Sequence, residues 1–281
     1  MSSTKICVNV KNLSKRIGKF ELKDISIEIP YGYVMGIAGR NGSGKTTLIN
    51  HVLNLLTQDS GIITVFDKEY PNNEVEIKDK IGFVFEEFHY LQNLSVDKMK
   101  NLIAPFYKSW NDKYFYEQIN KFNIDKTSKL KKLSKGQKQI FSLIIALSHD
   151  TNLLVLDEPF SGVDAKSKAS LIQILKDYTS NEQRSIIFCS HNSEELESLC
   201  DLITILQNGE VFSTGTVDEL LDSYVILSGS KDNIDEDLRS KIINYSENSF
   251  GFKGIVKTED SSQFTNIKSE RVTIKDILEI V

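Results

Sequence analysis

The sequence has no long hydrophobic run, and no apolar stretch in it approaches the ~18 residues that a membrane-spanning helix needs. We therefore expect no membrane span. Residues 1–5 lead directly into strand-like sequence, so we expect no signal peptide either. Cysteine is also scarce, and Cys7, Cys189 and Cys200 show neither a CxxC pair nor the spacing of metal ligands. This favours reduced, mostly buried thiols in a cytoplasmic protein.

An excess of positive charge is lacking as well, because the formal net charge is −5. This argues against DNA or RNA as the main partner, since both bind to a basic face. The 281 residues are 40% hydrophobic and 26% charged, which is typical of a soluble globular protein. A chain of this length predicts one large or two ordinary domains with a sizeable core.

What the sequence does contain is a glycine-rich stretch at residues 39–47, Gly-Arg-Asn-Gly-Ser-Gly-Lys-Thr-Thr. The apolar run at residues 34–38 predicts a buried strand before it, and the spacing at residues 48–53 predicts a helix after it. Strand, glycine loop and helix form the context of a phosphate-binding P-loop, whose backbone N–H groups and helix N-terminus hold phosphate oxygens. A glycine-rich turn with an incidental lysine is the alternative.

In a P-loop, Lys45 would reach the β- and γ-phosphates and the Thr46 hydroxyl would ligate Mg²⁺. The nucleotide-binding residues predicted from this motif are Gly39, Asn41, Gly42, Ser43, Gly44, Lys45, Thr46 and Thr47.

Two acidic residues and a histidine follow two further predicted strands. Asp157 and Glu158 come directly after four apolar residues, 153–156, which predict a strand buried on both faces of a parallel sheet. His191 follows the predicted strand at residues 185–190. Open α/β sheets bind ligands at the carboxyl ends of their strands, so we expect these side chains beside the nucleotide. Acids that merely open a turn and a structural histidine are the alternatives.

The middle of the chain, residues 88–132, is aromatic and helical in pattern. A small helical core is the favoured interpretation. The alternative is that part of the set forms a docking surface, and the aromatics could do both. The aromatic residues concerned are Phe106, Tyr107, Trp110, Tyr114, Phe115, Tyr116 and Phe122.

Further strands are predicted at residues 6–10, 20–29, 61–66 and 81–86, with a polar turn at residues 14–20. Asn208-Gly209 predicts a hairpin between two later strands. After Tyr224 the pattern changes to a polar linker at residues 228–233, short alternating strands and a last helix. That helix would be capped by Thr273 and Asp276.

Taken together, these stretches resemble the ATP-binding subunit of ABC transporters over roughly residues 5–222. The ordered set is specific to that family. It comprises the P-loop, the signature-like Leu-Ser-Lys-Gly-Gln at residues 133–137, the Walker B strand at 153–158, the D-loop-like residues 161–164, and the switch residue His191. Residues 106–137 and the short tail resemble bacterial exporters of drugs, bacitracin-type peptides and amphipathic peptides, whose membrane subunit is a separate chain.

The resemblance implies an α/β fold. Its core would be a P-loop NTPase with a mixed or parallel sheet and an antiparallel β subdomain. An α-helical subdomain would be inserted at about residues 88–150, and a small α+β extension would follow at the C-terminus. Residues 1–222 would form the ATP-binding domain, and residues 223–281 a small accessory domain.

The resemblance also implies a mechanism in which two subunits close head to tail around two ATPs. Asp157 would hold Mg²⁺, Glu158 would orient the attacking water, His191 would contact the γ-phosphate, and Asp164 would make contacts across the dimer. The signature residues that would contact the partner's ATP are Ser134, Lys135, Gly136 and Gln137.

Three positions depart from the family pattern. Ile17 stands where an aromatic residue usually stacks on adenine, and Phe20 is the candidate substitute. Glu86 stands at the Q-loop glutamine position, where its carboxylate would be a hard ligand for Mg²⁺ beside Thr46 and Asp157. Lys135 replaces a glycine of the signature, and we expect this change to be tolerated.

We therefore expect an ATPase that powers transport, in the direction of export, with ATP and Mg²⁺ as cofactors. Its expected partners are a second ATP-binding subunit and an integral membrane permease, with no nucleic acid. The permease would hold the chain at the inner face of the membrane, and the groove between residues 86–94 and residues 88–132 would receive a short permease helix. The alternatives are a soluble ABC ATPase acting on ribosomes or nucleic acid, and a low-turnover nucleotide-gated immunity or binding module.

Overall fold

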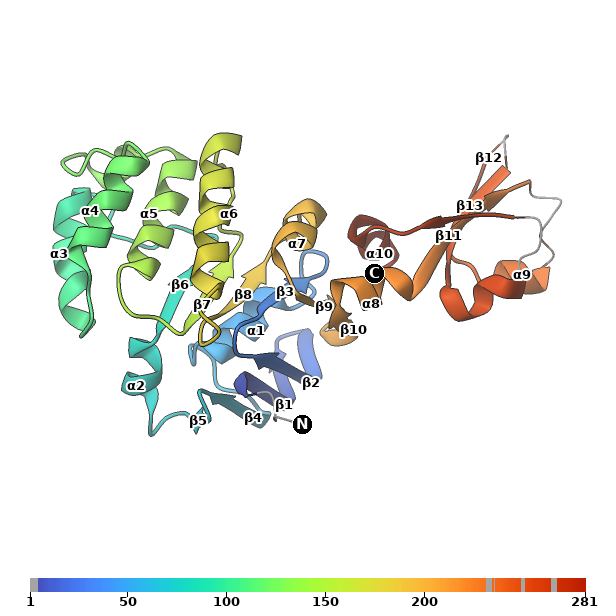
Figure 1. Ribbon diagram of the computed structural model, residues 1–281. Coiled ribbons are helices and arrows are strands. Elements are labelled where there is room, and N and C mark those ends of the chain that lie inside the picture. The colour runs from blue at the N-terminus through green and yellow to red at the C-terminus, as the bar shows by residue number, and fades with distance from the viewer. Residues whose placement is uncertain (1–4, 231–233, 235, 249–250, 264–266) are drawn as a thin grey trace.

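The computed structural model of the protein describes residues 5–230, 234, 236–248, 251–263 and 267–281. Within these residues the strands form a six-stranded central sheet, a four-stranded antiparallel sheet near the N-terminus and a four-stranded sheet in the tail (Figure 1). Helices surround the central sheet. This is the α/β P-loop NTPase architecture that the sequence predicted, with its antiparallel β subdomain, its helical insertion and its C-terminal α+β extension.

The central sheet has the strand order β10-β9-β3-β8-β7-β6. Every residue of β3, β7 and β8 is buried, as expected for parallel strands covered on both faces. Five strands are parallel and β10 is antiparallel to β9, so the sheet is mixed. The strands are β3 (Val34–Ala38), β6 (Ile81–Val84), β7 (Leu153–Asp157), β8 (Ser185–Cys189), β9 (Leu202–Gln207) and β10 (Glu210–Thr216).

The antiparallel sheet has the order β2-β1-β4-β5 and corrects one expectation. Its strands are β1 (Ile6–Ile17), β2 (Phe20–Pro30), β4 (Ser60–Val65) and β5 (Lys68–Glu69). The polar turn predicted at residues 14–20 is wrong, because Lys15, Arg16 and Ile17 continue β1 and pair with β2. Arg16 and Ile17 are exposed at the end of a hairpin whose turn is only Gly18 and Lys19.

Helices α1 to α7 lie between residues 45 and 199. Helices α3, α4 and α5 gather at one side of the molecule and form the predicted helical insertion, with α6 beside them (Figure 1). The bounds are α1 (Lys45–Val52), α2 (Glu74–Asp79), α3 (Val96–Ile103), α4 (Asp112–Lys121), α5 (Lys135–Leu147), α6 (Ala165–Thr179) and α7 (Ser193–Leu199), with 3₁₀ turns η1 (Ala104–Phe106) and η2 (Leu130–Lys132).

Aromatic side chains form part of the helical core, as predicted. Phe115 is fully buried, with its ring centroid 5.9 Å from that of Trp110 and 6.4 Å from that of Phe141. Phe106 does not belong to this core, because 79% of it is exposed. The core interpretation therefore does not extend to Phe106, which follows α3 in a 3₁₀ turn at the surface.

The tail forms an antiparallel sheet of order β12-β13-β11-β14. Its elements are β11 (Tyr224–Gly229), α9 (Glu236–Ser240), β12 (Ile243–Asn248), β13 (Gly251–Lys257), η4 (Thr258–Gln263), β14 (Lys268–Arg271) and α10 (Ile274–Ile280), and the short helix α8 (Val217–Asp222) precedes them. The linker predicted at residues 228–233 is wrong at its start, because residues 228 and 229 lie in β11; residues 231–233 lie outside the described residues. The predicted cap of the last helix is present, with Thr273 and Asp276 in a capping box.

Helix α10 attaches the tail to the helices beside the central sheet. Ile274 and Ile277 are fully buried in the core that also includes residues of α7. The backbone N–H of Ile274 donates a hydrogen bond to Oε1 of Glu197 in α7, at 2.8 Å. The tail therefore shares a core with the residues before it, although the predicted domain boundary falls between α8 and β11.

The helical core gives a direct test. Phe115→Ala removes a fully buried ring and should lower the free energy of unfolding by about 3–5 kcal/mol. Phe106→Ala is the matched control, since its exposed ring should leave stability nearly unchanged. Urea unfolding of both variants measures the difference, and equal effects would contradict the core assignment.

Candidate nucleotide-binding site

The glycine loop connects the end of β3 to the start of α1, as the sequence predicted. Gly39 has φ of +143°, and a Cβ there would lie 2.3 Å from the carbonyl oxygen of Leu206. No larger residue fits, so the chain can leave β3 and turn tightly only with glycine at this position. Glycine at this position thus gives the backbone the tight turn that a phosphate-binding loop needs.

Lys45 lies at the first position of α1 and its ammonium points back over the loop. Its Nζ donates to the carbonyl oxygens of Gly39 at 2.8 Å and Arg40 at 3.1 Å. The Ser43 hydroxyl is buried and has no hydrogen-bond partner within the described chain. An unpaired buried hydroxyl is unfavourable, and a phosphate oxygen is a group that could satisfy it. These residues fit a phosphate ligand.

Thr46 and Asp157 meet across the gap between α1 and β7. The Thr46 hydroxyl donates to Oδ2 of Asp157 at 3.0 Å. Burial raises the pKa of Asp157, and the charges of Glu158 and Glu86 raise it further. Hydroxyl and carboxylate oxygens are the ligands that Mg²⁺ prefers, and a cation would offset this concentration of negative charge.

The described residues contain no group of three or more His, Cys, Asp or Glu side chains that could hold a metal ion alone. Magnesium commonly takes one or two protein ligands and completes its shell with phosphate oxygens and water. Thr46 and Asp157 can supply such a pair. Glu86 lies in the exposed loop after β6, and its charge acts on Asp157. The strand predicted at residues 81–86 ends at Val84.

Glu158 and His191, the two predicted catalytic residues, are in direct contact. Oε1 of Glu158 accepts a hydrogen bond from the backbone N–H of His191 at 2.9 Å and lies 2.8 Å from Nδ1 of its ring. The Glu158 side chain is 12% exposed and the imidazole is 74% exposed. The carboxylate is therefore held in place, whereas the ring projects toward open space.

The signature residues form the start of α5. The Ser134 hydroxyl accepts from the backbone N–H of Gln137 at 3.1 Å, and the Gln137 side chain accepts from the backbone N–H of Ser134 at 3.1 Å. A Cβ on Gly136 would lie 2.3 Å from the carbonyl oxygen of Gly162. The side chain of Lys135 lies over Gly162. The signature therefore packs, backbone to backbone, on the loop after β7.

Asp164 caps α6 within its own chain. Its Oδ1 accepts from the backbone N–H groups of Lys166 at 3.1 Å and Ser167 at 3.0 Å. Hydrogen bonds from the side chain and backbone of Ser167 hold the pKa of Asp164 below its usual range. Its predicted contact with a second subunit stays a prediction.

Ile17 and Phe20 face each other across the β1–β2 hairpin, so their side chains lie on the same face. A Cβ on Gly44 would lie 2.9 Å from Cζ of Phe20, which places the ring against the P-loop. Ile17 is 42% exposed beside it. The stacking role expected of Phe20 in place of an aromatic residue at Ile17 stays a prediction.

Two residues at this site were missed by the sequence analysis. Gln139 is buried in α5, and its Nε2 donates to the carbonyl oxygens of Phe85 at 3.3 Å and Glu86 at 2.9 Å. It holds the loop that carries Glu86; a polar residue next to the apolar stripe of the helix was the signal. Arg40 donates to the carbonyl oxygen of Glu279 in α10 at 3.1 Å, a contact that no sequence pattern indicated.

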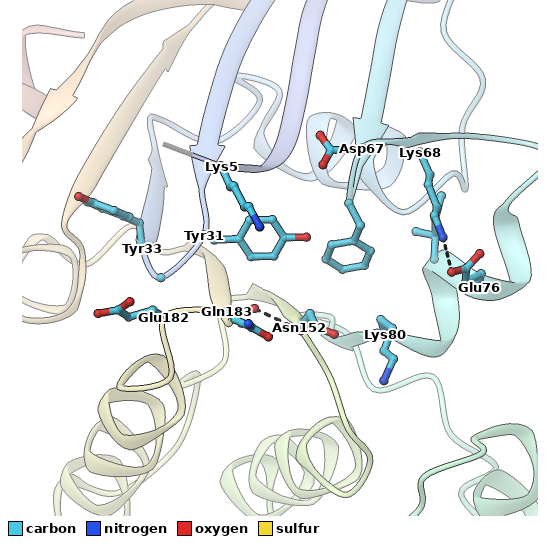
Figure 2. Close-up of a pocket in the computed structure, with 13 residues that line it drawn as sticks. Lys5, Tyr31, Tyr33, Asp67, Lys68, Glu76, Lys80, Asn152, Glu182 and Gln183 are labelled. Atoms are coloured by element: carbon cyan, nitrogen blue, oxygen red, sulfur yellow. Dashed lines mark hydrogen bonds and ion pairs between the residues drawn. The ribbon is translucent and has the colours of Figure 1, made fainter. Parts of the chain in front are cut away.

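A separate cavity of about 820 Å³ lies away from these residues. Figure 2 shows Tyr31, Asp67, Lys80 and Gln183 among its lining side chains. These residues precede strands of the central sheet or lie in the β4–β5 turn, whereas the P-loop and His191 follow strands. The cavity is therefore at the opposite edge of the sheet and is not part of the nucleotide site.

The chain is similar to known proteins in sequence and fold. The family model described as ABC transporter matches residues 22–161. The chain is 30% identical to the ABC transporter ATP-binding protein YtrB of Bacillus subtilis (strain 168) over 219 residues. The aligned region covers 78% of this chain and 75% of that protein. The chain belongs to the ABC transporter ATP-binding proteins. Its P-loop site is accordingly that of an ATPase.

Other ABC relatives extend the comparison. The uncharacterized ABC transporter ATP-binding protein YhaQ of Bacillus subtilis (strain 168) is 32% identical over 274 residues, which is 91% of this chain and 88% of that protein. The methionine import ATP-binding protein MetN of Clostridioides difficile (strain 630) is 32% identical over 225 residues, or 76% of this chain and 70% of that protein. Similarity therefore includes an import protein.

The dimeric ATP-binding cassette MJ0796, solved in a post-hydrolysis state with ADP and Pi, superposes with a TM-score of 0.65. It is 23% identical, with 74% of this chain and 98% of that chain covered. This likeness confirms the ABC ATPase fold. Of the helices in the described part of the chain, none is both long and apolar enough to cross a membrane.

The environment of Asp157 predicts a pH-dependent stability. A raised pKa means that the ionised carboxylate disfavours the folded, metal-free protein at neutral pH, and that this penalty disappears as the pH falls through the raised value. Asp157→Asn should therefore raise the melting temperature at pH 7 in EDTA without nucleotide, and the gain should shrink on acidification.

Asp164→Asn is the control, because its carboxylate has a lowered pKa and should give no such gain. A pH-independent effect of Asp157→Asn would contradict this explanation.

Proposed function

We propose that this ATP-binding subunit powers export through a separate integral membrane permease. The observation that carries the ATPase part is the cluster of Thr46, Asp157, Glu158 and His191 beside the P-loop. Export is supported by the resemblance of residues 106–137 and of the tail to exporter subunits. The similarity to the import protein MetN makes direction the point to test.

In this proposal two chains bind ATP between the P-loop of one and the signature of the other. Lys45 exchanges its bonds to loop carbonyls for phosphate oxygens. Ser134 and Gly136 present a hydroxyl, a backbone N–H and the N-terminus of α5, a 13-residue helix, to the partner's γ-phosphate. Asp164, at the end of the loop that contacts Gly136, makes contacts across the dimer. Ile17 and Phe20 line the base, with Phe20 as the stacking ring.

Thr46 and Asp157 would hold Mg²⁺, and Glu86 would add negative charge nearby. Bound there, Mg²⁺ would supply charge neutralisation at the phosphate oxygens. Glu158 orients and polarises the attacking water, and the exposed ring of His191 contacts the γ-phosphate. Positioning and charge stabilisation account for most of phosphoryl-transfer catalysis, and in this proposal these residues would provide both.

The permease contact is proposed at an apolar groove of about 520 Å³. It lies beside the segment expected from the sequence, between the end of α1, α2, β6 and η1, rather than along residues 86–94. A short amphipathic helix of the permease would bury its apolar face there and hold the chain at the inner face of the membrane. The apolar lining residues are Leu53, Leu55, Val75, Ile81, Phe83, Phe85, Phe106 and Tyr107.

Composite sites predict a concentration-dependent ATPase. Steady-state activity of the purified chain should rise faster than linearly with protein concentration, because each site needs a second chain. Glu158→Gln should lower kcat by about 100-fold or more, the loss typical of a removed general base. Activity that scales linearly, or that survives in Glu158→Gln, would contradict the proposal.

The groove predicts a separation of transport from hydrolysis. Phe106→Asp places a charge in the proposed permease contact and should reduce transport in membranes by about 10-fold, the effect of losing about 1.4 kcal/mol of binding. Basal ATPase of the isolated chain should remain. Leu102→Asp is the control, since Leu102 is also exposed, at 47%, but does not line the groove. Equal loss of ATPase and transport in Phe106→Asp would refute the groove.

A further inference from the structure

The loop that carries His191 is anchored by a buried carboxylate that belongs to neither the P-loop nor the signature. Ser190 is fully buried, and its hydroxyl donates to Oε2 of Glu195 at 2.7 Å. The same hydroxyl accepts from the backbone N–H of Asn192 at 3.1 Å. Both neighbours of His191 are therefore fixed through Ser190, and Ser190 is fixed by Glu195.

The second oxygen of this carboxylate reaches a different element. Oε1 of Glu195 accepts from Nζ of Lys168 at 2.5 Å. Lys168 lies in the first turn of α6, the helix that Asp164 caps. One side chain of α7 thus connects the loop carrying His191 to the helix that follows the D-loop.

The ion pair between Glu195 and Lys168 is largely shielded from solvent. The Glu195 side chain is 9% exposed and that of Lys168 is 26% exposed. Removing two charges from water is costly, so a buried pair is weak evidence for stability and more often serves to fix a geometry. Here both carboxylate oxygens are satisfied and each bond goes to a different segment of the site.

We propose that Glu195 is a positioning residue for His191, and that its ion pair with Lys168 makes the position of the loop carrying His191 depend on α6, the helix that follows the D-loop. The inference rests on the proposed roles of His191 and Asp164. Because the backbone N–H of His191 donates to Glu158, a shift of Ser190 also moves the carboxylate that orients water. Glu195 itself touches no reacting atom.

A defined kinetic signature is expected from this arrangement. In the proposed site, the contacts that hold the base and most of the phosphates come from the P-loop and the β1–β2 hairpin, and this network reaches the nucleotide only through His191 at the γ-phosphate. Weakening the network should therefore lower kcat and leave KM for ATP within about twofold. Misplacement of a catalytic group by about 1 Å can cost 10²-fold in rate, so we expect a decrease of roughly 10- to 100-fold.

Two variants break the two links separately. Lys168→Met with Glu195→Gln removes the ion pair without leaving one buried charge unpaired, and the glutamine can still accept from Ser190. Ser190→Ala removes the other link and keeps the ion pair. Lys168→Arg, which retains the charge pair, should keep kcat close to that of the unchanged protein.

The matched control is Lys100→Met with Asp112→Asn. This pair joins α3 to α4, with the Lys100 side chain 7% exposed and its Nζ 2.8 Å from Asp112, and it lies in the helical insertion. It should leave kcat unchanged. Steady-state ATPase, equilibrium ATP binding and thermal unfolding of the full chain are measured for every variant.

A lower kcat in both network variants, with ATP binding and melting temperature retained, supports the positioning role. Unchanged kcat in folded variants overturns it, and so does a joint fall of kcat, ATP binding and melting temperature, which is the mark of a structural role. Glu158→Gln separates the two levels: if it stays active the proposed catalytic roles fail, and if it is inactive while the network variants are not, only this inference fails.

Discussion

The site depends on the register of three parallel strands, because that register sets where their carboxyl ends lie relative to one another. In the central sheet Ile37 of β3 is in register with Cys189 of β8, and Cys189 is in register with Asp157 of β7. The chain therefore leaves all three strands along one line. The P-loop, the two acidic residues and the loop of His191 begin there, so the parallel register alone assembles residues more than 100 positions apart.

This constraint explains why so much of the site could be predicted. A run of buried apolar residues marks a parallel strand, and the residues directly after such a strand must lie at the common edge. Glu158 and His191 were assigned in this way, and they are in direct contact. The capping pair at Thr273 was equally local, because its partners are three residues apart.

The features that could not be predicted depend on contacts between distant elements or on the solvent side of a strand. The polar residues before Gly18 suggested a turn, but a strand with one solvent-exposed face also carries polar side chains, so the sequence pattern does not distinguish the two. Phe106 suggested core, since an aromatic residue gives no sign of its exposure. Gln139 is buried against main-chain carbonyls of a loop 53 residues away, a partner that no local pattern reveals.

The contact between Arg40 and the carbonyl oxygen of Glu279 has a thermodynamic consequence. Through this hydrogen bond the conformation of the P-loop and the docking of α10 depend on each other. Linkage is reciprocal: if ATP binding changes the affinity of the P-loop for α10, then docking of α10 changes the affinity for ATP by the same factor. A partner that binds the tail and displaces α10 would then change the affinity for ATP, and ATP would change the affinity for that partner by the same factor.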